Sequence, residues 1–336
     1  MARPEFDPYL NDPERWGVSL AQMAELMLPC LDAIGARSVA EVGAYAGDLT
    51  RVLAGWAADS GARVLAIDPA PQPGLLALAQ ARPELELIGE TSLAALPELP
   101  MPDALVIDGD HNYFTVSEEL RLIGERAAGK HLPLLLFHDV CWPHGRRDDY
   151  FDAEQIPESY RHPVAGEAGG LFPGDPGIRP GGLPYPRSAA HEGGPRNGVL
   201  TAAEDFVAGR EDLRLVVVPA FFGFGAVWPT AARWSDELAR ILDPFDRHPI
   251  IARLEASRVH HLALGHSRLG ELWSAQKRLA RQEEVLRRLL DSSAFAVAER
   301  LSRLRASAGV ATEQSIVSKE EIRRALADGL PPGAGG

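Results

Sequence analysis

Five acidic and imidazole side chains follow two neighbouring apolar segments of the sequence: Asp108, Asp110, His111, His138 and Asp139. Carboxylate oxygen and imidazole nitrogen together suit a hard or borderline divalent cation such as Mg²⁺ or Mn²⁺. Buried anions that lack such a cation, a proton or an arginine partner repel one another and lose their hydration. Arg146 and Arg147 in the following loop are the alternative partners. We favour a divalent metal site.

A second group of residues suits a nucleoside-like ligand. The motif GluValGlyAlaTyrAlaGly, residues 41–47, joins a short apolar segment to the start of a helical one. Gly43 and Gly47 permit a sharp turn and a close approach of ligand to backbone, and the helix that follows presents free N–H groups. Asp68 ends the next apolar segment, where a carboxylate can accept hydrogen bonds from ribose hydroxyls. A purely structural turn and a helix cap are the alternatives for the glycines and for Asp68.

The elements that must position these residues are short β-rich segments alternating with helical ones. The strands are expected at 38–42, 63–67, 85–88, 104–108, 132–139, 213–218 and 224–228. This alternation predicts an α/β fold, a doubly wound and mostly parallel seven-stranded sheet. Only PAFFG separates the last two strands, which is too short for a helical crossover, so the final strand should be antiparallel. Ser92, just after the third strand, would lie near an adenine ring.

Residues 141–198 interrupt the alternation with a segment rich in Gly and Pro. A stretch of this length inside a compact domain is usually a functional loop or a disordered one. It follows the fifth strand's carboxyl end, where open α/β sheets bind ligands, so we expect an ordered lid over the substrate. Aromatic and arginine side chains in it could bind the acceptor or serve only to pack the loop: Trp142, Tyr150, Tyr160, Tyr185, Arg146, Arg147 and Arg196.

The motifs EVGAYAG, AIDPA, VIDGDHNY and LLFHDV together resemble those of the class I S-adenosylmethionine-dependent methyltransferases. The similarity is to the metal-dependent O-methyltransferase branch that includes macrolide sugar and catechol-type enzymes, and it covers about residues 38–228. It implies a Rossmann-like methyltransferase fold and binding of S-adenosylmethionine by Gly43, Gly47 and Asp68, with Glu41 and Ser92 completing the cofactor set.

The same resemblance implies that Mg²⁺ or Mn²⁺ is held by Asp108, His138 and Asp139. His138 departs from the family pattern, which usually has Asp or Glu at that position. His111 stands three residues after Asp108, the offset at which the macrolide sugar enzymes carry a general base; the alternative is that His111 only orients Asp108. A divalent cation lowers the pKa of a hydroxyl, and a neutral imidazole can take its proton.

The function expected from these residues is methyl transfer to a hydroxyl of a small molecule, such as a sugar or phenol of a natural product, with Asp108 and His111 as the catalytic pair. Two alternatives remain open at this point. One is a non-catalytic scaffold that binds S-adenosylmethionine. The other is a hydroxylase-associated protein of the cephalosporin-modifying type, whose relatives share the IDGDH strand end and which would require a redox partner.

Composition limits the classes of partner. The formal net charge of −13, from 34 basic and 47 acidic residues, disfavours nucleic acid and anionic membranes. The two cysteines, Cys30 and Cys141, form no disulfide framework or thiolate zinc motif. The first residues are acidic and rich in Pro, unlike a signal peptide, and the longest apolar stretch is too short to span a bilayer. We expect a cytoplasmic protein.

The sequence divides into four parts. Residues 1–37 are expected to be an N-terminal helical segment, and 38–230 the catalytic domain. Residues 231–310 are expected to form a helical arm, because Leu272, Leu279 and Leu286 repeat at heptad spacing. The arm either pairs with a second copy in a homo-oligomer or packs on its own domain. Residues 311–336 are expected to be a tail, whose last part, LADGLPPGAGG (326–336), should be frayed.

Overall fold

The structure is a computed structural model, and it describes residues 19–128, 132–167, 169–309 and 318–328. The chain forms two compact units, residues 1–266 and 267–336. The sheet and all the candidate site residues belong to the first unit. Its described part begins with a 3-10 turn, Leu20–Met23, and helix α1, Ala24–Ile34. The rest of the predicted N-terminal segment, residues 1–18, lies outside the described residues.

The first unit contains the seven-stranded sheet that the sequence predicts. The strands are β1 (Ser38–Val42), β2 (Arg63–Ile67), β3 (Leu85–Ile88), β4 (Ala104–Ile107), β5 (Leu134–Phe137), β6 (Leu213–Val218) and β7 (Phe224–Pro229). Their order is β3-β2-β1-β4-β5-β7-β6. Strands β1 to β5 pair in parallel, whereas β7 is antiparallel to both β5 and β6. The prediction of one reversed strand is therefore confirmed.

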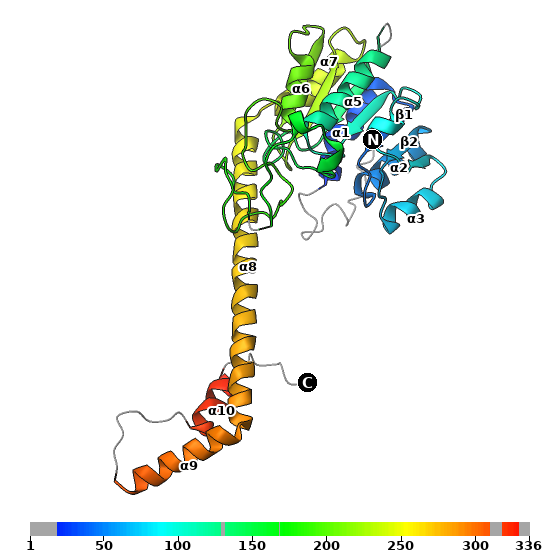
Figure 1. The fold of residues 1–336 in the computed structure, drawn as a ribbon. Helices are drawn as coiled ribbons and strands as arrows, with labels where there is room; N and C mark the ends of the chain where they lie inside the picture. Colours follow the sequence, from blue (N-terminus) through cyan, green and yellow to red (C-terminus); the bar gives the residue numbers. More distant parts are fainter. Residues whose placement is uncertain (1–18, 129–131, 168, 310–317, 329–336) are drawn as a thin grey trace. The chain divides into compact units, whose positions relative to one another are not determined.

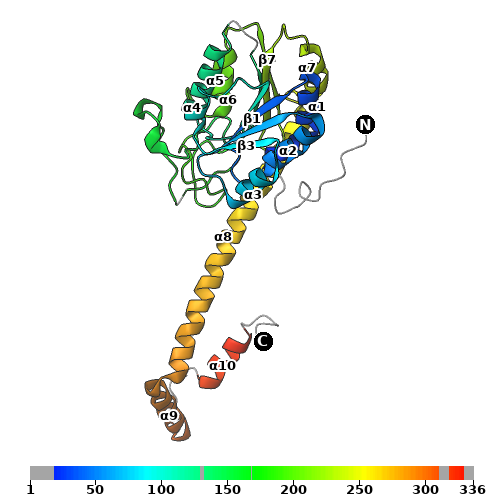
Figure 2. The same ribbon diagram turned by 90° about the vertical axis from the view of Figure 1, so that its right-hand side faces the viewer.

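Helices cover both faces of the sheet, because buried side chains alternate along each strand. On β1, Val39 belongs to one apolar cluster and Ala40 to the other. Helices α1, α2 (Asp48–Ser60), α3 (Pro73–Ala81) and α7 (Ser235–Leu242) pack on the first face. Helices α4 (Ser92–Ala95), α5 (Tyr113–Arg126) and α6 (Val199–Val207) pack on the second. The two layers are visible in Figures 1 and 2.

The register of the parallel strands brings the residues that follow them to one edge. Val42 of β1 is level with Ile67 of β2 and with Ile107 of β4. The ladder continues one step further: the N–H of Asp108 donates to the Val42 carbonyl, and the N–H of His138 donates to the Ile107 carbonyl. The strand order reverses between β1 and β4, which is where open α/β sheets bind ligands.

Residues 141–198 contain no α-helix in their described part. Two 3-10 turns, Ala153–Gln155 and Glu158–Tyr160, and four isolated β-bridges organise the segment. Several of its backbone groups are bonded to distant parts of the loop itself; for example, the N–H of Ala189 donates to the Asp148 carbonyl at 2.7 Å. The segment is thus a folded loop with its own hydrogen bonds.

Helices follow the sheet. Helix α8, Pro249–Asp291, begins in the first unit and continues into the second, which also holds α9, Ser293–Ser307, and α10, Lys319–Asp328. Within the predicted tail, residues 319–328 form α10, so the expected fraying of residues 326–336 is wrong for residues 326–328; residues 311–317 and 329–336 lie outside the described residues. Leu272 and Leu279 are 53% and 58% exposed. Within the described ranges, no helix combines the length and the apolarity needed to cross a membrane.

Candidate active site

Asp108, His111 and Asp139 come together at the carboxyl edge of the sheet. One ligand-type atom from each lies within 4.8 Å of the others. The Nδ1 atom of His111 is 3.4 Å from Oδ2 of Asp139. Asp139 is buried, whereas Asp108 and His111 are partly exposed, so the cluster remains accessible on one side. Two carboxylates beside an imidazole are a donor set that fits a divalent cation.

His138 lies beside this cluster with both ring nitrogens engaged. Nδ1 is 3.0 Å from Oδ1 of Asp108, and Nε2 is 2.9 Å from the Phe221 carbonyl oxygen. Because a carbonyl and a carboxylate both accept, each nitrogen donates a proton. Burial lowers the pKa of His138, but the carboxylates of Asp108 and Asp139 outweigh it and raise that pKa to about 10. With both nitrogens engaged in this way, His138 supports Asp108, and the group of metal-type atoms among the described residues, from Asp108, His111 and Asp139, does not include it.

The backbone of Asp139 is in the left-handed region, with φ of 57°. Aspartate tolerates this conformation better than most residues, and such outliers gather at functional sites. Burial by itself would raise the pKa of the Asp139 carboxyl. The adjacent His138, His111 and His144 more than offset burial and hold that pKa below its ordinary value. Asp139 is therefore ionised at neutral pH.

Backbone conformation and contacts within the protein explain the two glycines of the 41–47 motif. Gly43 has φ of 87°, and a Cβ there would lie 2.1 Å from the Asp108 carbonyl oxygen. Gly47 has φ of 85°, and the atoms nearest to a Cβ there belong to Leu75, the first at 3.4 Å. The structural turn that was the alternative interpretation of this motif is present. Cofactor contact at these glycines stays a prediction.

The remaining residues of the expected cofactor set are buried along the same edge. Asp68 accepts from the N–H groups of Tyr45 and Ala70, both at 2.7 Å, through different oxygens. Glu41 is 2% exposed, and its Oε2 atom has no hydrogen-bond partner among the described residues. Burial, reinforced by Asp108 and Asp68, raises the pKa of Glu41 to about 8. Ser92 is buried at the first residue of α4.

The loop 141–198 contributes two rings next to the cluster. The imidazole of His144 stacks on that of His111, with centroids 5.4 Å apart and 12° between the planes. Tyr185 meets His144 edge-on at 4.8 Å. His144 is 3% exposed, and burial lowers its pKa, which favours a neutral ring. His144 was absent from the sequence-based site, because nothing in the motif marks it as close to His111.

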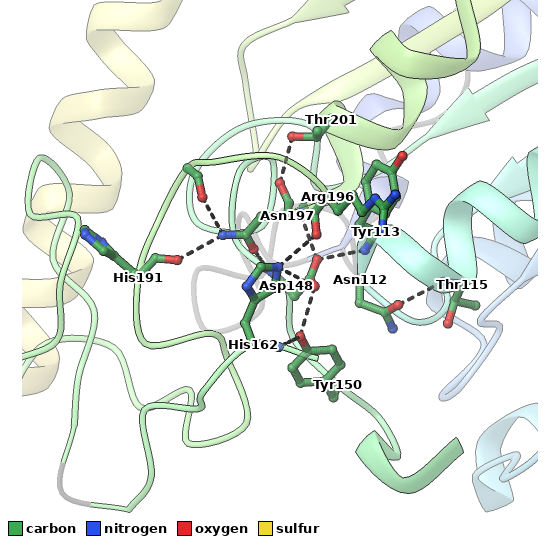
Figure 3. Close-up of polar contacts among 12 residues, drawn as sticks. Asn112, Tyr113, Thr115, Asp148, Tyr150, His162, His191, Arg196, Asn197 and Thr201 are labelled. Atoms are coloured by element: carbon green, nitrogen blue, oxygen red, sulfur yellow. Dashed lines mark hydrogen bonds and ion pairs between the residues drawn. The ribbon is translucent and has the colours of Figure 1, made fainter. Parts of the chain in front are cut away.

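Asp148 anchors this loop to the helices that flank the site (Figure 3). One of its oxygens accepts from the N–H of Tyr113 at the start of α5, at 2.8 Å, and from the N–H of Gly198 before α6, at 2.7 Å. The other accepts from the hydroxyl of Tyr150 at 3.0 Å. Asn197 accepts from the N–H of Asp148 at 2.7 Å. A carboxylate at two helix N-termini is favourable, because it meets unpaired N–H groups and the positive ends of both dipoles.

The arginines of the loop have structural partners. The buried Arg147 donates to the carbonyls of Ala189 and Pro176, at 2.6 and 2.9 Å. Arg146 pairs with Glu204 of α6 at 2.6 Å. Within the described residues, neither arginine contacts the carboxylates of Asp108 or Asp139. Most of the loop aromatics likewise pack within the protein: Tyr150 on Asp148, and Tyr160 on Tyr113, Phe114 and Arg196.

Comparisons with known protein families and solved structures find similarity to methyltransferases. Residues 40–140, which run from β1 to just past β5, match a family model for a methyltransferase domain. No curated protein matches the sequence.

Among solved structures, a methyltransferase of Podospora anserina bound to S-adenosylhomocysteine is 14% identical, with 65% of this chain and 82% of that chain covered and a TM-score of 0.39. The O-methyltransferase TomG of Streptomyces achromogenes, involved in tomaymycin synthesis, is 16% identical over 63% and 82%, with a TM-score of 0.37. A Burkholderia thailandensis N1-methyltransferase acting on 1,6-didemethyltoxoflavin is 15% identical over 63% and 78%, with a TM-score of 0.36.

Proposed function

We propose that the chain is an S-adenosylmethionine-dependent O-methyltransferase that uses a divalent cation, Mg²⁺ or Mn²⁺, and acts on a hydroxyl of a small molecule. The supporting observation is the position of the Asp108–His111–Asp139 cluster beside Glu41 and Asp68 at the switch point of the sheet. Sugars and phenols of natural products are the acceptor class we propose, since their hydroxyls need activation before they attack a methyl group.

The cofactor half of the site fits a cationic nucleoside. Each oxygen of Asp68 already accepts one backbone N–H and retains lone pairs for ribose hydroxyls. Glu41 has a buried oxygen without a hydrogen-bond partner in the described chain. A positively charged ligand near Glu41 would compensate the ionised carboxylate, which burial otherwise disfavours. These two carboxyl groups are therefore the residues we assign to S-adenosylmethionine.

The metal half would be formed by Asp108 and Asp139. A divalent cation bound there would supply Lewis-acid activation of the acceptor hydroxyl. His138 donates to Asp108 and thereby fixes the orientation of that carboxylate. Asp139, next to Nδ1 of His111, favours the tautomer with the proton on Nδ1. The Nε2 atom of His111 is then free to accept the hydroxyl proton, which is the role we propose for it.

Methyl transfer from labelled S-adenosylmethionine to a panel of hydroxylated acceptors tests the proposal. We expect activity that is lost on chelation and restored by Mg²⁺ or Mn²⁺. Asp108→Asn should lower kcat/KM by about 100-fold or more while leaving the affinity for S-adenosylhomocysteine unchanged. Asp68→Ala should weaken that affinity. Asp212→Asn, at an exposed aspartate, is the control for the loss of one charge.

His111→Asn separates the two roles open to that imidazole. If His111 is the base, the substitution should reduce kcat and change the Mn²⁺ affinity by less than about threefold. A loss of Mn²⁺ affinity of about tenfold or more would instead mean that His111 helps to hold the metal, as a ligand or by orienting Asp108. Tight binding of S-adenosylhomocysteine with no transfer to any acceptor, whatever the metal, would favour the scaffold alternative.

A further inference from the structure

The turn between β6 and β7 holds two phenylalanines in a conformation that such residues rarely adopt. Phe221 and Phe222 have φ of 52° and 67°, and Gly223 follows at 100°. Aromatic residues in the left-handed region are unfavourable, and they persist only where the surrounding structure fixes them. The contacts that fix this turn come from two sides.

One side is the end of β5, next to the Asp108–His111–Asp139 cluster. The N–H of Cys141 donates to the Phe222 carbonyl at 2.7 Å. A Cβ at Gly223 would lie 2.6 Å from the Cys141 nitrogen, so the two segments are in close backbone contact. The Nε2 of His138 donates to the Phe221 carbonyl at 2.9 Å, and its Nδ1 donates to Asp108 at 3.0 Å. The turn therefore determines where His138 can place its ring.

The other side is the first part of α8, within the first unit. Oε1 of Glu255 accepts from the N–H of Phe222 at 2.8 Å. Arg258, one turn further along, donates to both oxygens of Glu255, at 2.6 and 2.7 Å. Its guanidinium carbon lies 4.6 Å from the Phe222 ring centroid. Glu255 is only 9% exposed, so water cannot easily replace its carboxylate as the acceptor, and losing it would leave the N–H of Phe222 without a partner at a cost in free energy.

We propose that Glu255 is a positioning residue for the metal site, acting through the Phe221–Phe222 turn and His138 on Asp108. This inference rests on the proposed function for its metal, although the chain of contacts exists without one. Glu255 holds the N–H of Phe222, the turn presents the Phe221 carbonyl, and that carbonyl fixes the His138 ring against Asp108. The beginning of α8 thus supports the site as well as connecting the two units.

The test measures Mn²⁺ affinity by electron paramagnetic resonance in the full chain. Glu255→Ala should weaken Mn²⁺ binding by about tenfold, the lower end of the range for residues that support metal ligands. Glu255→Gln should recover most of the affinity, because the amide oxygen still accepts from Phe222. The affinity for S-adenosylhomocysteine should change less than about twofold, since the hydrogen bonds of Glu255 within the described residues go to Phe222 and Arg258 and not to the cofactor residues.

Glu237→Ala is the matched control, since Glu237 also pairs with an arginine three residues later on a helix, Arg240, but away from the turn. It should leave Mn²⁺ binding unchanged. If Glu255→Ala fails to fold, Arg258→Met is measured in the same way. This variant loosens Glu255 without removing it, and a smaller loss in the same direction is expected.

A double-mutant cycle tests the route. In a His138→Ala background, Glu255→Ala should cause no further loss of Mn²⁺ affinity, because its effect passes through the missing ring. Additive losses would overturn the proposal, as would unchanged Mn²⁺ binding in Glu255→Ala.

The imidazole N–H resonances of His138 in the metal-free protein provide a readout that does not depend on the metal. They should shift in Glu255→Ala and stay in place in Glu237→Ala. A wild-type protein that binds no Mn²⁺ would refute the metal in the proposed function. The His138 resonances would then be the remaining test of the contacts that link Glu255 to His138. Resonances that do not shift in Glu255→Ala would overturn the proposal.

Discussion

Glu41 gives a quantitative test of the electrostatics at the cofactor edge. It is 2% exposed, and burial together with the nearby carboxylates of Asp108 and Asp68 raises its pKa from 4.5 to about 8. A carboxyl with a raised folded-state pKa binds its proton more tightly in the folded protein than in the unfolded chain. Its contribution to stability is therefore complete below about pH 4.5 and is lost as the pH rises to about 8.

At 1.36 kcal/mol per pKa unit, this loss amounts to roughly 3 kcal/mol between pH 5 and pH 8. Glu41→Gln removes the titration and keeps the shape of the protonated carboxyl. We expect the free energy of unfolding of the variant, relative to wild type, to rise by that amount over this range. Urea denaturation of the metal- and cofactor-free protein at several pH values measures it. Glu86→Gln, at an exposed position of β3, controls for the loss of a carboxylate. A difference that does not vary with pH would refute a buried, protonated Glu41.

Three further predictions concern the fold and the arm. Asp148→Asn should lower the free energy of unfolding by about 1–3 kcal/mol and expose the loop 141–198 to proteolysis, because the amide oxygen can replace only one carboxylate oxygen and the amide nitrogen would face a donor, the Tyr150 hydroxyl; an unchanged cleavage pattern would contradict this. Gly43→Ala should destabilise by roughly 3 kcal/mol or more, as seen by thermal unfolding, because its Cβ would lie 2.1 Å from the Asp108 carbonyl oxygen; Gly47→Ala should cost about 1–2 kcal/mol, because its Cβ would meet Leu75 at 3.4 Å, an ordinary contact distance. Light scattering should give wild type a mass well above the 36.3 kDa of one chain and Leu272→Lys with Leu279→Lys a monomeric mass, whereas a monomeric wild type would reject pairing of the arms.

The sheet could be predicted closely because its signals are local. Short apolar segments bounded by Gly, Pro and acidic residues gave the seven strands within two residues at each end. The reversal of β7 followed from the length of the PAFFG connection. The clustering of Asp108, His111 and Asp139 followed from the rule that parallel strands end at a common edge. In each case neighbouring residues in the sequence carry the information.

The parts that could not be predicted depend on contacts between distant residues. His138 looked like a ligand by its position, but the Phe221 carbonyl, 83 residues away, occupies its second nitrogen. Arg147 looked like a partner for the metal carboxylates, but it is buried among loop carbonyls. Helix α10 lies in a segment whose Gly- and Pro-rich end suggested fraying. No pattern of local spacing reveals which distant carbonyl a side chain will meet.

The bare Cα of Gly43 serves the architecture before it serves any ligand, because the peptide after β4 occupies the space that a methyl group would need. A descendant that had lost its activity would keep this glycine for as long as it kept its sheet, so the residue is a poor marker of a working enzyme. Engineers seeking a different cofactor preference would leave it untouched and vary the neighbouring carboxyl groups, whose replacement does not require the strands to separate.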